Sequence, residues 1–251
     1  MFNVLFKFNF QQIRPIFRKT RMNTDNLHMS PDFKRQPIKI CGLTRPDEAI
    51  QCEAAGASAI GLVFYPPSPR CVPVEQALTI RAALSADTTV VGVFVNESIE
   101  VILSTVRQCN LNAVQLHGQE PPEMVDRLKG EGILVIKSVF LDHEPFFRDA
   151  VQYPASAFLA ECGRGRLPGG NALAWKWETA RALSQSVPLI LAGGLNPENV
   201  RLAMRDAAPD AVDVSSGVEF CPGRKDISKV RLFIQAVAGH DGHQHNRRIF
   251  L

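Results

Sequence analysis

The feature that most constrains this chain is an alternation that runs from about Pro37 to Ala238. A short apolar run is followed by a turn and an amphipathic helical stretch, and this unit occurs eight times. Strands that alternate with helices form parallel sheets, because each helix returns the chain to the starting edge. Eight such units in about 202 residues predict an α/β fold, a single-domain (β/α)8 TIM barrel of parallel strands. The predicted strands are 38–42, 58–64, 89–96, 112–118, 133–140, 157–161, 188–194 and 210–217.

Helix-start signals lie between these strands. Pro46 precedes two acidic residues, and Asn196-Pro197-Glu198 supplies a cap, a first-turn proline and an acid. The stretch 142–152 is the poorest helix of the set, so the fifth connection fits the pattern least well.

An open, doubly wound sheet is the structural alternative. Neither GxGxxG nor GxxxxGK[ST] occurs, so neither common nucleotide-binding fingerprint supports that alternative.

Composition argues against two classes of protein. No apolar run approaches the roughly 18 residues that a membrane-spanning helix needs. The basic charge is local, because residues 1–35 carry a net charge of +5 and the remaining 216 residues carry −2. The body therefore lacks the basic patch typical of nucleic-acid-binding proteins. Its six scattered cysteines form no CxxC pair or zinc spacing, which favours a reducing, cytoplasmic location.

The two ends of the chain differ from its middle. Residues 1–36 are predicted to be a disordered basic extension, and a start at Met22 or Met29 would remove most of it. A targeting peptide is the third interpretation, since the segment is basic and poor in acids. The barrel domain is expected to cover 37–238, and 239–251 to be a disordered tail. Three histidines lie close together in that tail, but the sequence positions no other ligand beside them, so no metal site is predicted.

Catalytic groups of a barrel lie at the C-terminal ends of its strands. Cys41 ends the first strand, and period-two alternation places it on the same face as Lys39. A thiol near an ammonium group could have a lowered pKa and act as a base or nucleophile; a core cysteine is the alternative. Glu161 closes the sixth strand, where its carboxylic acid could protonate a sugar ring oxygen or simply form a salt bridge at the rim.

Two glycine-containing loops predict a phosphate site. They follow the seventh and eighth strands, where barrels commonly bind phosphate, and their glycines permit close approach of the backbone to an anion. Arg70 follows a proline-rich turn and could hold a substrate carboxylate in bidentate fashion; a solvated arginine is the alternative. The phosphate-binding candidates are Gly193, Gly194, Ser215, Ser216 and Gly217, and the other substrate-binding candidates are Arg70, Gln115, His117 and Asp213.

Several sequence blocks resemble those of the phosphoribosylanthranilate isomerases of tryptophan biosynthesis. From about 38 to 235 they read KICGLTRPDEA, GLVFYPPSPR, VGVFVN, VQLHG, LAGGLNPENV and VDVSSGVE, followed by PGRKD. The resemblance implies an Amadori rearrangement of N-(5-phosphoribosyl)anthranilate to the carboxyphenylamino-deoxyribulose phosphate, without a metal or organic cofactor. It also implies that Cys41 is the general base and Glu161 the general acid. Arg70 would hold the anthranilate carboxylate, and Asp213 would orient the ribose.

The chain departs from the family pattern after the sixth strand. That pattern has an Asp, then GGTG and a Phe-Asp-Trp motif, whereas this chain reads AFLAE and then PGGNALAWKW. Glu161 keeps the carboxylic acid but moves it by about one methylene.

Two other functions stay open: Schiff-base chemistry on a sugar phosphate through Lys39 or Lys137, and phosphosugar binding without catalysis. In each case the expected partner is a small phosphosugar, with no nucleic acid or membrane, and the protein is a monomer or homodimer.

Overall fold

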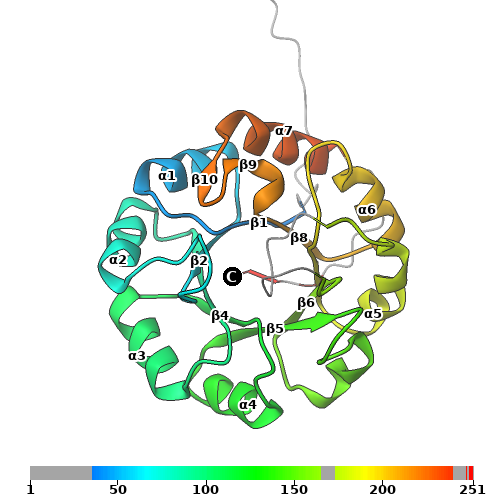
Figure 1. Ribbon diagram of the computed structural model, residues 1–251, viewed down its shortest axis with the longest axis horizontal. Coiled ribbons are helices and arrows are strands. Elements are labelled where there is room, and N and C mark those ends of the chain that lie inside the picture. Colours follow the sequence, from blue (N-terminus) through cyan, green and yellow to red (C-terminus); the bar gives the residue numbers. More distant parts are fainter. Residues whose placement is uncertain (1–35, 165–172, 240–246, 248, 251) are drawn as a thin grey trace, which may run out of the picture. The chain divides into compact units, whose positions relative to one another are not determined.

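The computed structural model describes residues 36–164, 173–239, 247 and 249–250, all within one compact unit of 35–251. The predicted basic extension lies almost wholly outside the described residues. Eight parallel strands form a closed barrel in which β8 pairs with β1 (Figure 1), so the predicted TIM barrel is confirmed. The strands are β1 (Ile38–Cys41), β2 (Ala59–Val63), β3 (Thr89–Phe94), β4 (Ala113–Leu116), β5 (Leu134–Phe140), β6 (Ala157–Glu161), β7 (Leu189–Leu191) and β8 (Ala211–Val214).

Helices form a ring outside the strands (Figure 1). The fifth connection, which the sequence marks as the poorest helix, contains only the 3-10 helix η1 (Phe147–Gln152), and a short hairpin of β9 (Glu219–Cys221) and β10 (Arg224–Lys225) follows β8. No helix among the described residues is long and apolar enough to cross a membrane. The other helices are α1 (Pro46–Ala55), α2 (Val74–Ala83), α3 (Ile99–Cys109), α4 (Pro122–Gly130), η2 (Trp177–Ala180), α5 (Arg181–Ser186), α6 (Val200–Ala207), η3 (Ser216–Val218) and α7 (Ile227–Ala238).

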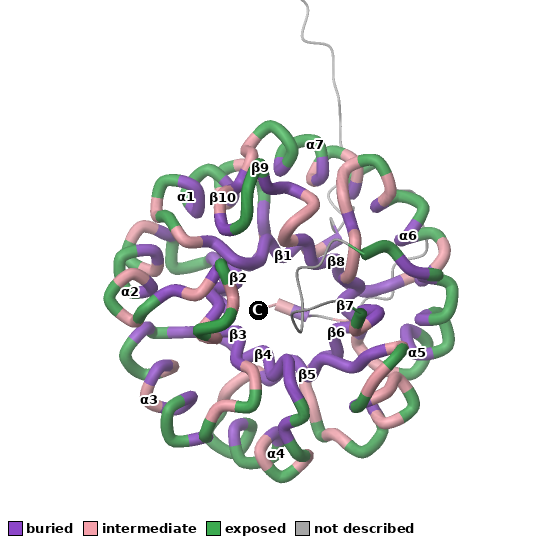
Figure 2. Tube along the Cα trace, in the orientation of Figure 1, coloured by how far each residue is buried: buried purple, intermediate pink, exposed green. Residues whose placement is uncertain are grey.

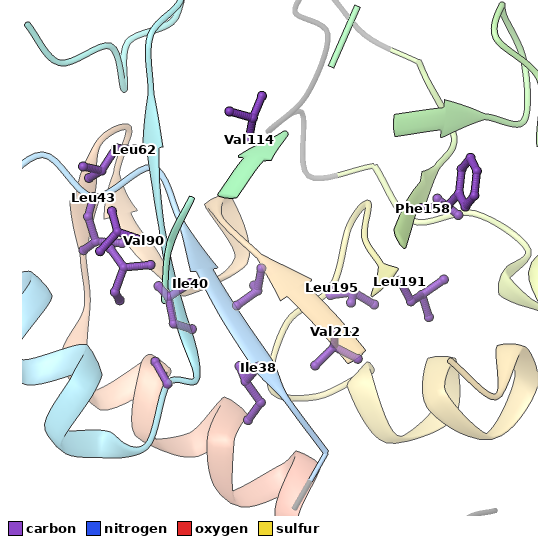
Figure 3. Packing of buried hydrophobic residues seen from close by; sticks show 14 of the residues in the cluster. Ile38, Ile40, Leu43, Leu62, Val90, Val114, Phe158, Leu191, Leu195 and Val212 are labelled. Carbon is purple, nitrogen blue, oxygen red and sulfur yellow. The ribbon is translucent and has the colours of Figure 1, made fainter. Parts of the chain in front are cut away.

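Side chains alternate between the two faces of the barrel wall. Outward-facing residues such as Ile38, Ile40 and Val212 pack with the buried faces of the helices in one large apolar cluster (Figure 3). The strands are buried along nearly their whole length (Figure 2), because helices cover one face and the barrel interior encloses the other. Polar side chains buried in this interior need hydrogen-bond or charged partners, so their pairing is informative.

The N-terminal end of the barrel interior is lined by unusually small side chains. The first residue of every even-numbered strand is alanine, and all four belong to one interior cluster. Barrel layers are more often filled by branched residues, so this alanine layer leaves space. The four residues of the alanine layer are Ala59, Ala113, Ala157 and Ala211.

Ile249 belongs to the same interior cluster and is only 2% exposed. In Figure 1 the short red segment of residues 249–250 lies within the ring of strands. Arg247 donates from Nη1 to the carbonyl oxygens of Ser184 (2.8 Å) and Val187. Arg247, Ile249 and Phe250 lie in the segment predicted to be a disordered tail, yet the structure packs them against the barrel, because the alanine layer accommodates an apolar side chain. The tail histidines lie outside the described residues.

Candidate active site

The interior face of β1 carries Lys39 and Cys41, as the alternation predicts. Lys39 is fully buried, and its Nζ lies 2.8 Å from Oδ1 of Asp213 on the neighbouring strand β8. Burial raises the pKa of the Cys41 thiol, and the charge of Lys39 acts in the opposite direction without overcoming it. The sequence-based idea of a lowered thiol pKa is therefore wrong for the free protein, because desolvation disfavours the thiolate.

Strand β2 provides the space that the thiol occupies. Cys41 lies opposite Gly61 in the β1–β2 pairing, and a Cβ at Gly61 would lie 2.7 Å from Cys41 Sγ. Any larger residue at this position would push the thiol aside. Gly61 thus contributes to the site by having no side chain. The sequence alone gives no reason to treat it differently from any other glycine in a strand.

Glu161 ends β6 and faces the histidine of β4. Its Oε1 lies 3.6 Å from His117 Nε2, and both side chains are largely buried. His117 Nδ1 lies 2.8 Å from Gln115 Nε2 and 2.6 Å from Ser138 Oγ, so the histidine, with its ring held on that side, meets the carboxylate through its other nitrogen. Gln115, His117 and Glu161 are thus brought together. Ser138 is a further member that the sequence reasoning missed, although it lies on the interior face of a predicted strand.

One cavity connects the acid with both glycine-containing loops. Glu161 and Asp213 line it together with four of the five phosphate-binding candidates, namely Gly193, Gly194, Ser215 and Ser216. Gly217 lies beside it, where a Cβ would overlap the carbonyl oxygen of Leu195, so the two loops meet backbone to backbone. The Ser215 hydroxyl donates to the carbonyl oxygen of Cys41 (3.0 Å), which ties the end of β8 to the end of β1.

Arg70 is buried rather than solvated, with 6% of its surface exposed. Its Nε and Nη2 donate to the two carboxylate oxygens of Glu219, at 2.9 and 2.7 Å. Lys225 Nζ lies 2.7 Å from the same carboxylate, so two cations share one anion. Burial opposes ionisation of Glu219, but Arg70 and Lys225 together lower its pKa. Glu219 and Lys225 were not among the sequence candidates, although the VDVSSGVE and PGRKD blocks contain them.

The two lysines considered for Schiff-base chemistry each form an ion pair with a carboxylate. Lys137 alternates with the interior residues Ile136 and Ser138, so it faces outward, where its Nζ contacts Glu120 (2.8 Å) and the carbonyl oxygen of Gly118 (2.7 Å). Lys39 is interior but paired with Asp213. Within the described residues, no group of three or more His, Cys, Asp or Glu side chains is arranged to hold a metal ion.

Comparison with known proteins gives a consistent result. The family model for N-(5'phosphoribosyl)anthranilate (PRA) isomerase matches residues 38–236. The chain is 54% identical over 198 residues to N-(5'-phosphoribosyl)anthranilate isomerase of Desulfatibacillum aliphaticivorans, covering 79% of this chain and 91% of the relative.

Two solved structures extend the comparison. A phosphoribosyl anthranilate isomerase in complex with reduced 1-(o-carboxyphenylamino)-1-deoxyribulose 5-phosphate is 41% identical, with a TM-score of 0.72, covering 81% of this chain and 98% of that chain. Monomers generated from the dimeric isomerase of Thermotoga maritima are 40% identical, with the same TM-score and the same coverage. The matched region of this chain is the barrel, and it carries the residues described above.

Proposed function

Because the chain belongs to the N-(5'-phosphoribosyl)anthranilate isomerase family, we propose how its own residues perform the reaction of that family. The enzyme converts N-(5-phospho-β-D-ribosyl)anthranilate into 1-(2-carboxyphenylamino)-1-deoxy-D-ribulose 5-phosphate in tryptophan biosynthesis. The observation that carries the residue assignment is the cavity in which Glu161 and Asp213 lie with the loops after β7 and β8. It offers an acid and backbone amide donors within one space.

Glu161 is the general acid of the first step. Its protonated carboxyl group transfers the proton to the ribose ring oxygen, the C1′–O bond breaks, and the anilino nitrogen forms a protonated Schiff base with C1′. His117, whose Nε2 lies 3.6 Å from Oε1 of Glu161, is the polar neighbour of this carboxyl group inside the barrel. Gln115 and Ser138 hold the other side of that ring.

Cys41 is the general base of the second step. Its thiolate removes the proton from C2′, and the electron pair of that bond forms the C1′–C2′ double bond while the Schiff-base nitrogen accepts electrons. The resulting enaminol then tautomerises to the ketone of the product. Lys39 supports the thiolate by its charge, which opposes the burial that raises the Cys41 pKa. Asp213, held by Lys39, orients the ribose hydroxyl groups.

The substrate's two anionic ends bind to different groups. The phosphate accepts hydrogen bonds at the loops of Gly193, Gly194, Ser215, Ser216 and Gly217, where glycines let the backbone approach. Arg70 binds the anthranilate carboxylate. Glu219 accepts hydrogen bonds from its Nε and Nη2, which fixes the orientation of the guanidinium group and leaves Nη1 as the proposed donor to the anthranilate carboxylate.

The assignment is tested with Cys41→Ala and with Glu161→Gln beside Glu161→Asp as a matched control. Cys41→Ala should abolish turnover and leave the affinity for the reduced product analogue near the wild-type value. Glu161→Gln should lose most of its kcat, whereas Glu161→Asp should retain more, because it keeps an acid. Full turnover in Cys41→Ala would refute the base, and equal kcat in wild type and Glu161→Gln would refute the acid.

The protein is proposed to act in the cytoplasm as a monomer or a homodimer. The proposed assignment uses residues of one chain and is compatible with both states, while the Thermotoga maritima relative is described as dimeric. Sedimentation equilibrium of the active enzyme distinguishes the two states. Activity per chain that is constant across the concentration range of dissociation supports the monomer as a complete catalyst.

A further inference from the structure

The two tryptophans of the chain both hold the loop that follows β7. Trp175 Nε1 donates to the carbonyl oxygen of Ala192 at 3.0 Å, and Trp177 Nε1 donates to that of Gly193 at 3.3 Å. The next carbonyl, of Gly194, accepts from Asn199 Nδ2 at 2.9 Å. Three successive carbonyl groups of one short loop are therefore bound by side chains, which is a dense set of contacts for a turn.

These contacts determine the direction of the loop's amide groups. A trans peptide is planar, so its N–H points opposite to its C=O. Binding of the Ala192 carbonyl therefore directs the N–H of Gly193, and binding of the Gly193 carbonyl directs the N–H of Gly194. Among the residues that the structure describes, neither N–H has a hydrogen-bond acceptor, and both glycines line the cavity.

Trp175 also reaches the strand that carries the acid. A Cβ at Gly193 would lie 2.8 Å from Trp175 Nε1 and 3.1 Å from Glu161 Cβ, so the indole, the loop and Glu161 meet at this glycine. Trp175 is 9% exposed and packs on Phe147, with ring centroids 5.6 Å apart. The indole is thus itself held in place, as a group that positions another must be.

We propose that Trp175 and Trp177 are positioning residues of the phosphate site. By binding the carbonyl groups of Ala192 and Gly193, the two indoles aim the amides of Gly193 and Gly194 at a phosphomonoester. This inference rests on the proposed phosphate-binding role of that loop and adds the groups that organise it. The tryptophans do not touch the substrate; they act through the loop backbone.

The test compares Trp175→Phe and Trp177→Phe with Thr179→Val. Each Phe variant keeps an aromatic ring and loses one N–H donor, whereas Thr179→Val removes a bond to the carbonyl of Lys176 within the same segment without touching the loop. The measured quantity is the ratio of affinities for the reduced product analogue with and without its phosphate group. That ratio should fall about 3- to 10-fold in each Phe variant, as expected for one hydrogen bond, and stay constant in Thr179→Val. KM should rise with kcat nearly unchanged.

A general loss of structure would weaken the binding of both analogues equally and leave the ratio of their affinities unchanged. An unchanged affinity ratio in both Phe variants therefore overturns the positioning role. If the wild-type enzyme itself bound the two analogues equally, the phosphate-site assignment would fail first. Intrinsic tryptophan fluorescence is an independent measure of phosphate binding, since both tryptophans of the chain contact the loop. Titration of the wild type with inorganic phosphate should change the emission, and the absence of any change would also count against the inference.

Discussion

Ile249→Ala tests whether the end of the chain fills the barrel. The side chain is 2% exposed and lies in an interior cluster that contains the four residues of the alanine layer, whose short side chains cannot extend to fill the space that Ile249 would leave. Removing a buried isoleucine side chain costs about 2–5 kcal/mol when its surroundings cannot collapse. A chain end can detach, which limits the loss, and we expect about 2 kcal/mol. For a domain of this size that is a fall in Tm of about 4–8 °C.

The assay is thermal and urea-induced unfolding followed by circular dichroism, with Leu232→Ala as the matched control. Leu232 is 54% exposed on the outer face of α7, so its truncation should change Tm by no more than about 1–2 °C. Both variants should retain the wild-type kcat/KM, because Ile249 lies at the end of the barrel opposite to the site. Equal Tm values for Ile249→Ala and the wild type would refute the packing argument.

Other predictions concern charge. Because burial raises the pKa of Cys41, kcat/KM should increase with pH through a value above the usual thiol pKa of about 8.5; a profile that is flat from pH 7 to 10 would contradict this. Lys39→Met removes the opposing charge and should shift that profile to still higher pH. Glu120→Gln leaves the buried Lys137 ammonium without its counter-charge and should cost about 3–5 kcal/mol in urea unfolding, with kcat retained in the folded fraction. Glu219→Gln should raise KM more than it lowers kcat, since the substrate-binding guanidinium loses a charged partner.

Local periodicity was sufficient to predict much of this protein. The face shared by Lys39 and Cys41 follows from the two-residue repeat of one strand, and the strand order follows from the alternation of strands with helices. Pairings between distant segments could not be predicted in this way. Arg70 and Glu219 are 149 residues apart, and a single sequence contains no signal that pairs them. The sequence therefore supported only two interpretations of Arg70, as a residue that binds the substrate carboxylate or as a solvated side chain.

The packing of Arg247, Ile249 and Phe250 against the barrel could not be predicted, for a related reason. Residues 239–251 are mostly polar and lack a helical period, which is typical of a disordered tail. The partner of Ile249 is a layer whose four alanines come from four separate strands. Each alanine alone is an ordinary strand residue, and only barrel closure turns them into a space that an apolar side chain can fill.

The distribution of charge among the described residues around the site supports the proposal that backbone groups bind the phosphate. Near the cavity Lys39 is neutralised by Asp213 and Arg164 by Asp142, so neither pair offers a net positive charge to a phosphate. Arg70 and Lys225 instead share the single carboxylate of Glu219, which leaves one positive charge beside the proposed position of the anthranilate carboxylate. Within the part of the chain that the structure describes, the groups left to bind a phosphate at the glycine-containing loops are N–H dipoles, and a dipole binds an anion well only when it points at it. For the described residues, the proposed phosphate site therefore depends on the precision of the loop backbone more than on unpaired cations.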